Sequence, residues 1–414
     1  MLNATSLPGE LAVLPLAHCA GRPASGPYPD TLKPILSLAA HAEAITEIAD
    51  WPGYAPTPLV ALPGLAQAAG VATIHYKHEA DRFGLGSFKA LGGAYAVLRL
   101  LKKEILRRSG HQASSRELLE GRFKDVVADI TVTCATDGNH GRSVAWGAQL
   151  FGCKCVIYIH ATVSEGRRAA IARYGAEVVR SPGNYDNAVR AADLAARENG
   201  WFIVSDTSYP GYTDVPRDVM QGYSVMVEEA LRQWPEATPP THVFIQGGVG
   251  GLAAAVCAHL WERLGDGRGR FVVVEPDKAA CLYASALAGT PTAVHGDLDT
   301  LMAGLACGEV SLIAWEVLEA GTSDFLTIPD AAAVACMRLL ADAPYGDTPI
   351  AAGESAVAGL AGMLMAAVRP ETAATLGLGA DSRVLLFGSE GATDPMLYEQ
   401  LVGRHAEAVE GATP

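Results

Sequence analysis

The feature that most constrains the fold is a repeating order of segments: a short apolar run, a glycine-bearing turn and an alanine-rich helical stretch. The runs are rich in β-branched residues, and the helical stretches between them include residues 165–175 and 184–199. Runs that are apolar at nearly every position are typical of strands covered by helices on both faces. Alternating strands and helices predict an α/β fold with parallel-rich, doubly wound sheets. The predicted strands are 71–77, 130–134, 155–159, 201–205, 242–246, 271–275 and 384–388.

Length and two polar segments indicate two lobes. A chain of 414 residues fits either one large domain with an insertion or two domains. Residues 107–125 are polar, and residues 232–242 contain three prolines, so both segments are typical of connections. We predict a small α/β lobe of residues 119–215, inserted into a larger lobe formed by residues 1–118 and 216–414.

Composition excludes several classes of function. The net charge of −14, from 31 basic and 45 acidic side chains, argues against a nucleic-acid partner. The apolar runs are too short to span a membrane, and the apolar N-terminal stretch lacks the basic start of a signal peptide. The eight cysteines are scattered and complete no zinc-ligand pattern, which is typical of a reducing compartment. We expect a soluble, cytoplasmic protein that binds no metal.

A glycine-rich run, "FIQGGVGGLAAAV" (244–256), is the first segment with chemical content. An apolar strand ends at Gln246, four glycines follow within residues 247–251, and an alanine-rich helix begins at once. Backbone N–H groups at such a helix start can bind a phosphate. The spacing is neither the P-loop nor the dinucleotide pattern, and Glu275 follows too late to bind a ribose. The run therefore favours a phosphate monoester, with a purely structural turn as the alternative.

A second loop, in "TCATDGNHGRSVAWGAQLFG" (133–152), gathers Asp137, Asn139 and His140 between glycines. It follows a predicted parallel strand, and the carboxyl ends of parallel strands are where α/β proteins place ligands. The alternative is structural: Asp137 as a helix N-cap and Asn139 as a left-handed turn residue.

Lys89 is unusual for its neighbours, which are small or apolar: Phe88, Ala90 and Leu91, with a glycine pair just beyond. A lysine normally has a pKa of about 10.4, and burial favours its neutral, nucleophilic amine. Such an amine condenses with an aldehyde, although a lysine reaching from an apolar helix face to solvent is the alternative. An aldehyde-reactive amine together with a phosphate cradle predicts the cofactor pyridoxal 5′-phosphate.

Three motifs in this order, "GSFKALGG", "TDGNHG" and "QGGVGG", resemble the fold type II pyridoxal-phosphate enzymes, which include threonine dehydratases and cysteine synthases. The residue before "GNHG" is Asp137, whereas the dehydratases have a small residue there. In this feature the chain resembles the diaminopropionate ammonia-lyase branch. It also resembles that branch in "QGY" (221–223), "VEPDKA" (274–279), "MAGLACGE" (302–309) and "GES" (353–355). The resemblance runs from about Pro52 to Asp394. It implies the two-lobed fold of that class.

The resemblance also assigns cofactor contacts. Lys89 would form the Schiff base with the cofactor, Asn139 would hydrogen-bond the 3′-oxygen of its ring, and Ser389 would face the ring nitrogen. The phosphate would be held by backbone amides of Gly247, Gly248, Val249, Gly250 and Gly251. A neutral hydroxyl at the ring nitrogen makes the ring a weaker electron sink than a carboxylate would, which favours loss of a β-substituent over transamination.

The substrate residues are implied in the same way. Lys89 would act as base at the α-carbon, and Asp137 would remove the α-proton of the opposite enantiomer or bind a β-ammonium. Asp206, in "SDTSYPGY", matches a family aspartate that serves the site. Tyr185 matches a family position near the substrate. A residue next to the cofactor contact in a tight loop, as His140 is, more often orders the loop than takes part in catalysis.

The implied activity is α,β-elimination of 2,3-diaminopropionate, as the D or L isomer or both, to pyruvate and ammonia through an aminoacrylate. The enzyme would be an ammonia-lyase of amino-acid metabolism and, as in the family, a homodimer. The alternatives are a dehydratase acting on serine, threonine or another β-substituted amino acid, a β-replacement synthase, and a non-enzymatic nucleotide-binding protein.

Overall fold

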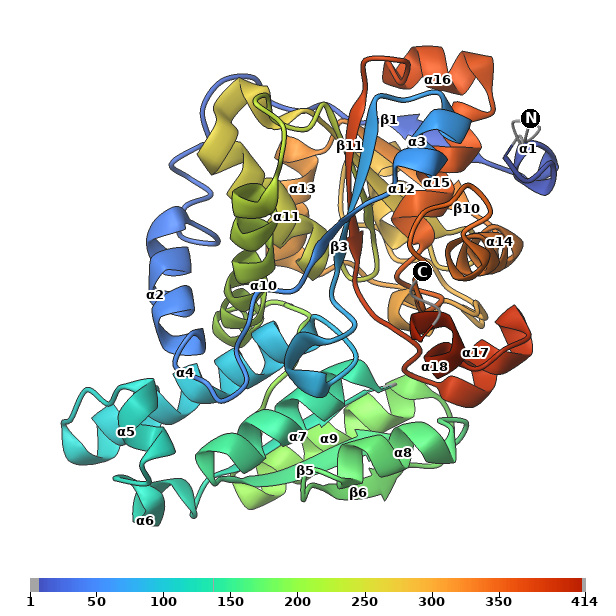
Figure 1. Cartoon of the computed structure of the whole chain (residues 1–414). Helices are drawn as coiled ribbons and strands as arrows, with labels where there is room; N and C mark the ends of the chain where they lie inside the picture. Colours follow the sequence, from blue (N-terminus) through green and yellow to red (C-terminus); the bar gives the residue numbers. More distant parts are fainter. Residues whose placement is uncertain (1–6, 137, 412–414) are drawn as a thin grey trace. The chain divides into compact units, whose positions relative to one another are not determined.

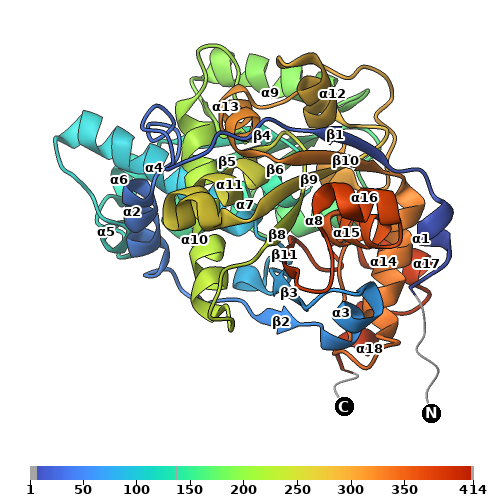
Figure 2. The ribbon, with the colours of Figure 1, turned by 90° about the horizontal axis from the view of Figure 1, so that it is seen from above.

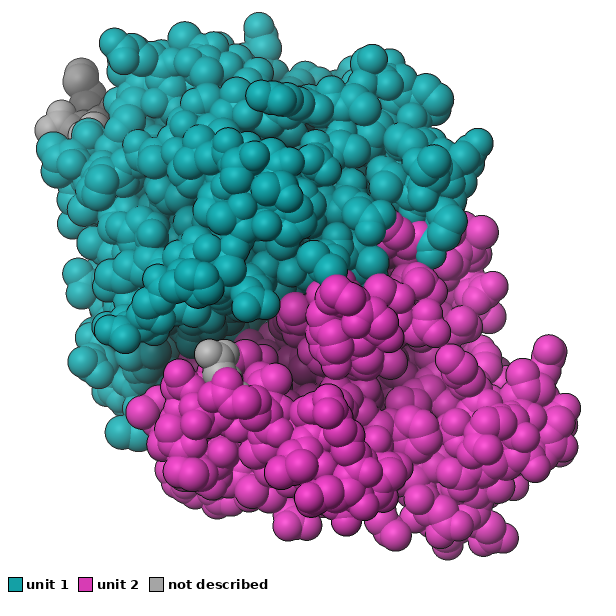
Figure 3. All heavy atoms as spheres, turned by 180° about the vertical axis from the view of Figure 1, so that it is seen from behind, with its two compact units in different colours: residues 1–34, 57–81, 226–414 teal, residues 35–56, 82–225 magenta. Residues whose placement is uncertain are grey.

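The computed structural model describes residues 7–136 and 138–411, and contacts divide the chain into two compact units. Unit 1 comprises residues 1–34, 57–81 and 226–414, and unit 2 comprises residues 35–56 and 82–225 (Figure 3). Unit 2 contains the whole of the predicted small lobe, residues 119–215. It also contains helix α4 (Lys89–Ser109), which packs along α7 (Asn139–Phe151). The lobe boundaries that we expect at residues 119 and 215 stay a prediction.

Unit 1 is built on a seven-stranded sheet of order β1-β10-β9-β8-β11-β3-β2 (Figure 2). The five inner strands are parallel, whereas β1 and β2 pair antiparallel at the two edges. Strands β8 and β10 are buried at every residue, as expected for strands covered on both faces. In sheet order, the strands are β1 (Ala17–Ala20), β10 (Asp324–Ile328), β9 (Arg270–Pro276), β8 (His242–Gln246), β11 (Arg383–Gly388), β3 (Thr73–His78) and β2 (Leu59–Ala61).

Helices cover both faces of this sheet. Helices α11 and α13 lie on one face, and α14 and α15 lie on the other (Figures 1 and 2). Helix α15 approaches β8 closely because Gly359 has no side chain, and a Cβ there would lie 2.7 Å from the Phe244 carbonyl oxygen. The helices of this unit are α1 (Glu10–Val13), α3 (Pro63–Ala69), α11 (Gly251–Leu264), α12 (Cys281–Ala288), α13 (Leu312–Gly321), α14 (Asp330–Asp342), α15 (Ala358–Ala367), α16 (Pro370–Leu376), α17 (Pro395–Val402) and α18 (Ala406–Glu410).

Unit 2 has a four-stranded parallel sheet of order β6-β5-β4-β7. The strands are β6 (Glu177–Arg180), β5 (Lys154–Ile159), β4 (Thr131–Ala135) and β7 (Phe202–Ile203). Helix α7 lies against α4 because glycines face the contact, and a Cβ on Gly147 would lie 2.7 Å from the Ala94 Cα. The remaining helices are α2 (Leu38–Ile48), α5 (Ser115–Leu119), α6 (Lys124–Val127), α8 (Glu165–Ala172) and α9 (Tyr185–Asn199), and α10 (Asp214–Gln233) continues into unit 1.

The predicted α/β fold with parallel-rich sheets is confirmed, and each predicted strand has a counterpart within a few residues. The sequence analysis missed four strands. Strands β1, β2 and β6 have four, three and four residues, which is too short for a clear pattern. Strand β10 is a buried inner strand of five residues, but Asp324 and Thr327 interrupt its apolar run. No helix in the described residues is both long enough and apolar enough to span a membrane.

Candidate active site

Lys89 and Asp206, two predicted site residues of unit 2, form an ion pair. Lys89 is the first residue of α4, and its Nζ lies 2.6 Å from Asp206 Oδ2. Asp206 follows β7, so a helix start and a strand end bring the two residues together across 117 positions of sequence. Their side chains are only 19% and 18% exposed. This pair places a carboxylate directly on the amine that we expect to react.

The charge of Asp206 is stabilised by its surroundings. Burial alone would raise the pKa of this carboxyl, but the ammonium charge of Lys89 and the hydrogen bond from Lys89 outweigh burial. The pKa of Asp206 is therefore held well below its usual range. The carboxylate is ionised at neutral pH.

His140, in the first turn of α7, lies beside the same carboxylate. Its Nε2 is 2.7 Å from the Val204 carbonyl oxygen, which can only accept a hydrogen bond, so Nε2 carries the hydrogen. Its Nδ1 lies 3.8 Å from Asp206 Oδ2. Burial lowers the pKa of His140, against the opposing effect of Asp206. The histidine is therefore a neutral group of fixed tautomer that anchors the loop, in agreement with a loop-ordering role.

Asn139 begins α7 and has a fixed amide orientation. Its Oδ1 accepts a hydrogen bond of 2.7 Å from Nη2 of Arg142. A guanidinium can only donate, so the oxygen of Asn139 faces Arg142 and the amide nitrogen is turned the other way. The turn itself is held by Thr136, whose Oγ1 accepts from the backbone N–H groups of Gly138 and Gly141, at 3.0 Å each. Asp137, the predicted second base, lies outside the described residues.

Tyr223 and Phe88 are aromatic neighbours of Lys89 that the sequence analysis did not single out as site residues. Lys89 Nζ lies 5.4 Å from the ring centroid of Phe88 and 5.8 Å from that of Tyr223. The Tyr223 ring occupies space that a Cβ on Gly92 would fill, at 2.3 Å from Cε1. The motif "QGY" was the available signal. Its role in supporting the lysine becomes visible only once α10 packs against α4.

Tyr185 is the first residue of α9, and its side chain is on the surface, with 39% of the residue exposed. Its placement near the substrate stays a prediction.

In unit 1, the glycine-rich run joins β8 to α11. The backbone N–H of Gly247 is already donated to the Val274 carbonyl oxygen at 2.8 Å. The amides of Gly248, Val249, Gly250 and Gly251 have no acceptor among the residues that the structure describes. These amides lie at the start of α11, a helix of 14 residues, whose dipole adds positive potential at this end. Four of the five predicted amides are thus available for a phosphate.

Glycine is required in this loop for packing and for backbone conformation. A Cβ on Gly247 would lie 2.8 Å from side-chain atoms of Leu282 and Val273. Gly250 has φ +99°, a conformation that favours glycine. The neighbouring Glu275 accepts from the backbone N–H groups of Leu282 and Tyr283, at 2.9 and 2.6 Å. Glu275 therefore organises the start of α12, and its exclusion as a ribose ligand is consistent with this position.

Ser389 directly follows β11 and is buried beside the end of β8. Its Oγ lies 2.6 Å from Nε2 of Gln246, and the same nitrogen lies 2.8 Å from the Phe387 carbonyl oxygen. Gln246 and Ser389 are 2% and 4% exposed. Gln246 appeared in the sequence only as the last strand residue before the glycines, so its side-chain role was missed.

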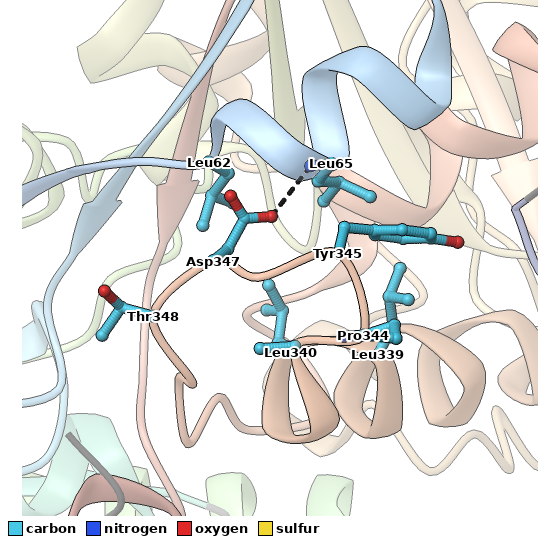
Figure 4. Close-up of a pocket in the computed structure, with 9 residues that line it drawn as sticks. Leu62, Leu65, Leu339, Leu340, Pro344, Tyr345, Asp347 and Thr348 are labelled. Carbon is cyan, nitrogen blue, oxygen red and sulfur yellow. Dashed lines mark hydrogen bonds between the residues drawn. The ribbon is translucent and has the colours of Figure 1, made fainter. Parts of the chain in front are cut away.

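These residues fit pyridoxal phosphate. Unpaired amides at a helix start suit a phosphate, a largely buried lysine amine suits an aldehyde, and a buried hydroxyl suits a ring nitrogen. A pocket elsewhere in unit 1, between α3 and the loop after α14, contains none of the predicted residues (Figure 4). Its polar group, Asp347, is already used by the N–H groups of Gly64 and Leu65, both at 2.8 Å. This pocket is therefore not the catalytic site.

Comparison with known proteins gives the same answer. A family model described as "Pyridoxal-phosphate dependent enzyme" matches residues 51–386. Diaminopropionate ammonia-lyase of Escherichia coli is 40% identical over 364 residues, which are 86% of this chain and 90% of that protein. The chain belongs to the diaminopropionate ammonia-lyase family of pyridoxal-phosphate-dependent enzymes. The resemblance of the motifs is thereby confirmed.

Solved structures of the Escherichia coli enzyme agree with this assignment. The crystal structure in complex with D-serine has a TM-score of 0.85 and 36% identity, covering 95% of this chain and 98% of that chain. The structure in complex with an aminoacrylate–pyridoxal-phosphate azomethine intermediate has a TM-score of 0.84 at the same identity and coverage. The predicted fold type II architecture and pyridoxal-phosphate cofactor are confirmed.

Proposed function

We propose that this enzyme catalyses the α,β-elimination of 2,3-diaminopropionate, with pyruvate and ammonia as products. The relatives that carry this activity in their names match most of the chain. The single structural observation that carries the proposal is the contact of 2.6 Å between Lys89 and Asp206, because it pairs the reactive amine with an ionised carboxylate. The reaction converts one diaminopropionate and one water into pyruvate and two ammonia molecules through 2-aminoacrylate.

The chain's own groups supply the proton transfers. Pyridoxal phosphate, when bound, supplies the electron sink that makes the α-hydrogen of the substrate acidic. Lys89 takes that proton, and Asp206, kept ionised by its lowered pKa, stabilises the resulting ammonium. His140 stays neutral and holds the loop beside Asp206, so the negative charge remains directed at Lys89. The β-carbon carries an ammonium group, which leaves as neutral ammonia while the electron pair at the α-carbon forms the double bond of 2-aminoacrylate.

The remaining site residues take the roles that the family resemblance assigns. Gly248 to Gly251 hold the phosphate through their available amides, Asn139 contacts the 3′-oxygen of the ring, and Ser389 contacts the ring nitrogen. Asp137 serves as base for the enantiomer that Lys89 cannot reach and binds the β-ammonium, and Tyr185 contacts the substrate. Support for Asn139 comes from its fixed amide, whose nitrogen is turned away from Arg142.

A substrate panel tests the proposal. The holoenzyme is assayed with D- and L-diaminopropionate, D- and L-serine and L-threonine, and the ketoacid and ammonia are measured together. We expect the highest kcat/KM with diaminopropionate. A higher value with serine or threonine would favour the dehydratase alternative, and a requirement for an added nucleophile would favour the synthase.

Asp206→Asn tests the pair of groups in the site. The variant keeps the size of the side chain but removes the charge, so kcat should fall by on the order of 10²–10⁴. Asp218→Asn is a matched control, because Asp218 Oδ1 lies 3.4 Å from Nε of Arg99 in the same unit but outside the site. Equal losses in the two variants would reduce Asp206 to a structural ion pair.

Assembly and location follow from the family resemblance and from the thiols. We infer a homodimer, to be tested by sedimentation, and a cytoplasmic enzyme. All eight cysteines are free, which supports a reducing compartment. The division into a small lobe of residues 119–215 and a larger remainder is part of the same proposal.

A further inference from the structure

The buried amide of Gln246 has only one possible orientation. Its Nε2 lies 2.8 Å from the Phe387 carbonyl oxygen, and a carbonyl can only accept a hydrogen bond. The amide oxygen cannot take that position, because two acceptors would then face each other. Nε2 therefore donates one hydrogen to Phe387, and its second hydrogen is directed at Ser389 Oγ, 2.6 Å away.

This orientation decides what Ser389 can do with its own hydrogen. The hydroxyl already accepts from Gln246, so its hydrogen cannot point along that contact. No residue in the described part of the chain accepts a hydrogen bond from Ser389. Ser389 is also buried, with 4% of the residue exposed. The hydrogen of Ser389 is thus left for an acceptor on a bound molecule.

We infer that Gln246 is a positioning residue that sets Ser389 as a hydrogen-bond donor toward the ring nitrogen of pyridoxal phosphate and thereby keeps that nitrogen unprotonated. The inference rests on the proposed function, which places the ring nitrogen at Ser389. A protonated nitrogen would need Ser389 to accept, which would leave the serine hydrogen buried without a partner. That penalty should disfavour ring protonation by roughly 10- to 100-fold.

The consequence is reaction specificity. An unprotonated ring withdraws electrons weakly, so the negative charge at the α-carbon is short-lived. The β-ammonium is therefore lost as ammonia before a proton can be added to the cofactor, which is the step that leads to transamination. Gln246 thus acts on the choice between elimination and transamination without touching the substrate. It is also the residue that immediately precedes the phosphate-binding glycines, so strand β8 positions both ends of the cofactor site.

The test uses holoenzyme reconstituted with pyridoxal phosphate labelled with ¹⁵N in the ring, because the ¹⁵N chemical shift distinguishes protonated from unprotonated nitrogen. Wild type should give the unprotonated signal at neutral pH. In Gln246→Glu, the new side chain should be protonated and donate its single hydrogen to Phe387. Its oxygen should then accept from Ser389, which is left to accept from the ring. The signal should move toward the protonated form, and pyridoxamine phosphate formed per turnover should rise at least tenfold.

Two further variants make the test selective. Gln246→Met removes both donors, so ring protonation should become easier than in wild type even if Gln246→Glu does not fold. Gln221→Glu is the matched control, because Gln221 Nε2 also donates to a carbonyl, that of Ser37 at 3.3 Å, and to a serine hydroxyl, that of Ser224 at 3.2 Å. This control should leave the ¹⁵N signal unchanged.

The outcomes separate the inference from the proposed function. A protonated ring nitrogen in wild type, or an unchanged signal in cofactor-loaded Gln246 variants, would overturn the inference while elimination activity stands. A wild-type protein that binds pyridoxal phosphate but releases no pyruvate from any amino acid would refute the proposed function instead.

Discussion

Gly250→Ala tests the phosphate cradle through the backbone alone. Gly250 has φ +99° and ψ −9°, and an L-residue in this conformation costs about 1–2 kcal/mol. The new Cβ would lie 3.1 Å from Leu318 Cδ1 and 3.2 Å from Leu282 Cδ2, which are the ends of flexible side chains, so packing should add only about 1 kcal/mol. The protein should fold. Rotation that relieves the strain would turn the amide of Gly250 or that of Gly251 away from a phosphate.

Loss of one hydrogen bond to a charged group is worth about 1.5–3 kcal/mol, so the Kd for pyridoxal phosphate should rise roughly 10- to 150-fold. The assay is titration of apoenzyme with the cofactor, followed by its visible absorbance, together with the Tm of the apoprotein. Gly403→Ala is the matched control, because Gly403 has φ +88° and ψ 8° at the end of α17. A Cβ there would meet nothing within 4 Å.

The control should show the same backbone strain in its Tm and an unchanged Kd. If both variants bind the cofactor equally well, the amides after Gln246 do not hold the phosphate, and the available N–H groups need another explanation. If both lose affinity equally, the effect comes from general destabilisation.

Further predictions concern the lysine, the second base, the ring contact and a buried acid. Lys89→Ala should lose nearly all turnover, and borohydride reduction followed by peptide mapping should label Lys89 in wild type; another labelled lysine would refute the site. Asp137→Asn should lower kcat/KM for D-diaminopropionate by on the order of 10²–10⁴ and spare the L isomer, whereas equal losses would leave Asp137 only a loop residue. Arg142→Met should free the amide of Asn139 to turn and shift the visible absorbance of bound cofactor; an unchanged spectrum would exclude this role. Burial raises the pKa of Glu275 from 4.5 to about 8, so the folded state retains a proton that the unfolded state releases between these values. The resulting stability is present below pH 4.5 and lost as pH rises to about 8, and Glu275→Gln should therefore gain Tm relative to wild type between pH 5 and pH 9.

Much of the fold could be predicted because the inner strands are buried on both faces and so carry continuous apolar runs. Strand β8 shows this most clearly, since its predicted and observed bounds are both 242–246. Three of the four strands that were missed are short, and two of these pair antiparallel at the edges of their sheet. The fourth, β10, is an inner strand, but its polar Asp324 and Thr327 break the apolar run that marks the other inner strands. Residues 17–20 become a strand only because β10 offers an edge, and nothing local to "AHCA" favours that pairing.

The candidate site also contains residues that could be predicted from the sequence and residues that could not. Lys89 and the glycine run were recognisable because chemistry requires unusual neighbours for them, and such neighbours are visible in sequence. Asp206 entered the predicted site only through the family resemblance, and its contact with Lys89 was not predicted, since no local pattern links two residues 117 positions apart. Tyr223 and Gln246 were missed because their positions resemble ordinary core residues. Their importance depends on which atoms the fold places beside them.

Three polar side chains in these two units could each be oriented or protonated in two ways. In each case a neighbouring group that can only donate or only accept a hydrogen bond determines which way is adopted. A backbone carbonyl fixes the tautomer of His140, a guanidinium fixes the amide of Asn139, and a second backbone carbonyl fixes the amide of Gln246. Each neighbour is either a pure donor or a pure acceptor, so no reorientation is available when a ligand arrives. In such a site the hydrogen-bond donors are oriented before the ligand binds, which lowers the free energy of reorganisation during the reaction. The orientations of His140 and Gln246 cannot be predicted from the sequence, because any residue can contribute the backbone carbonyl that fixes them.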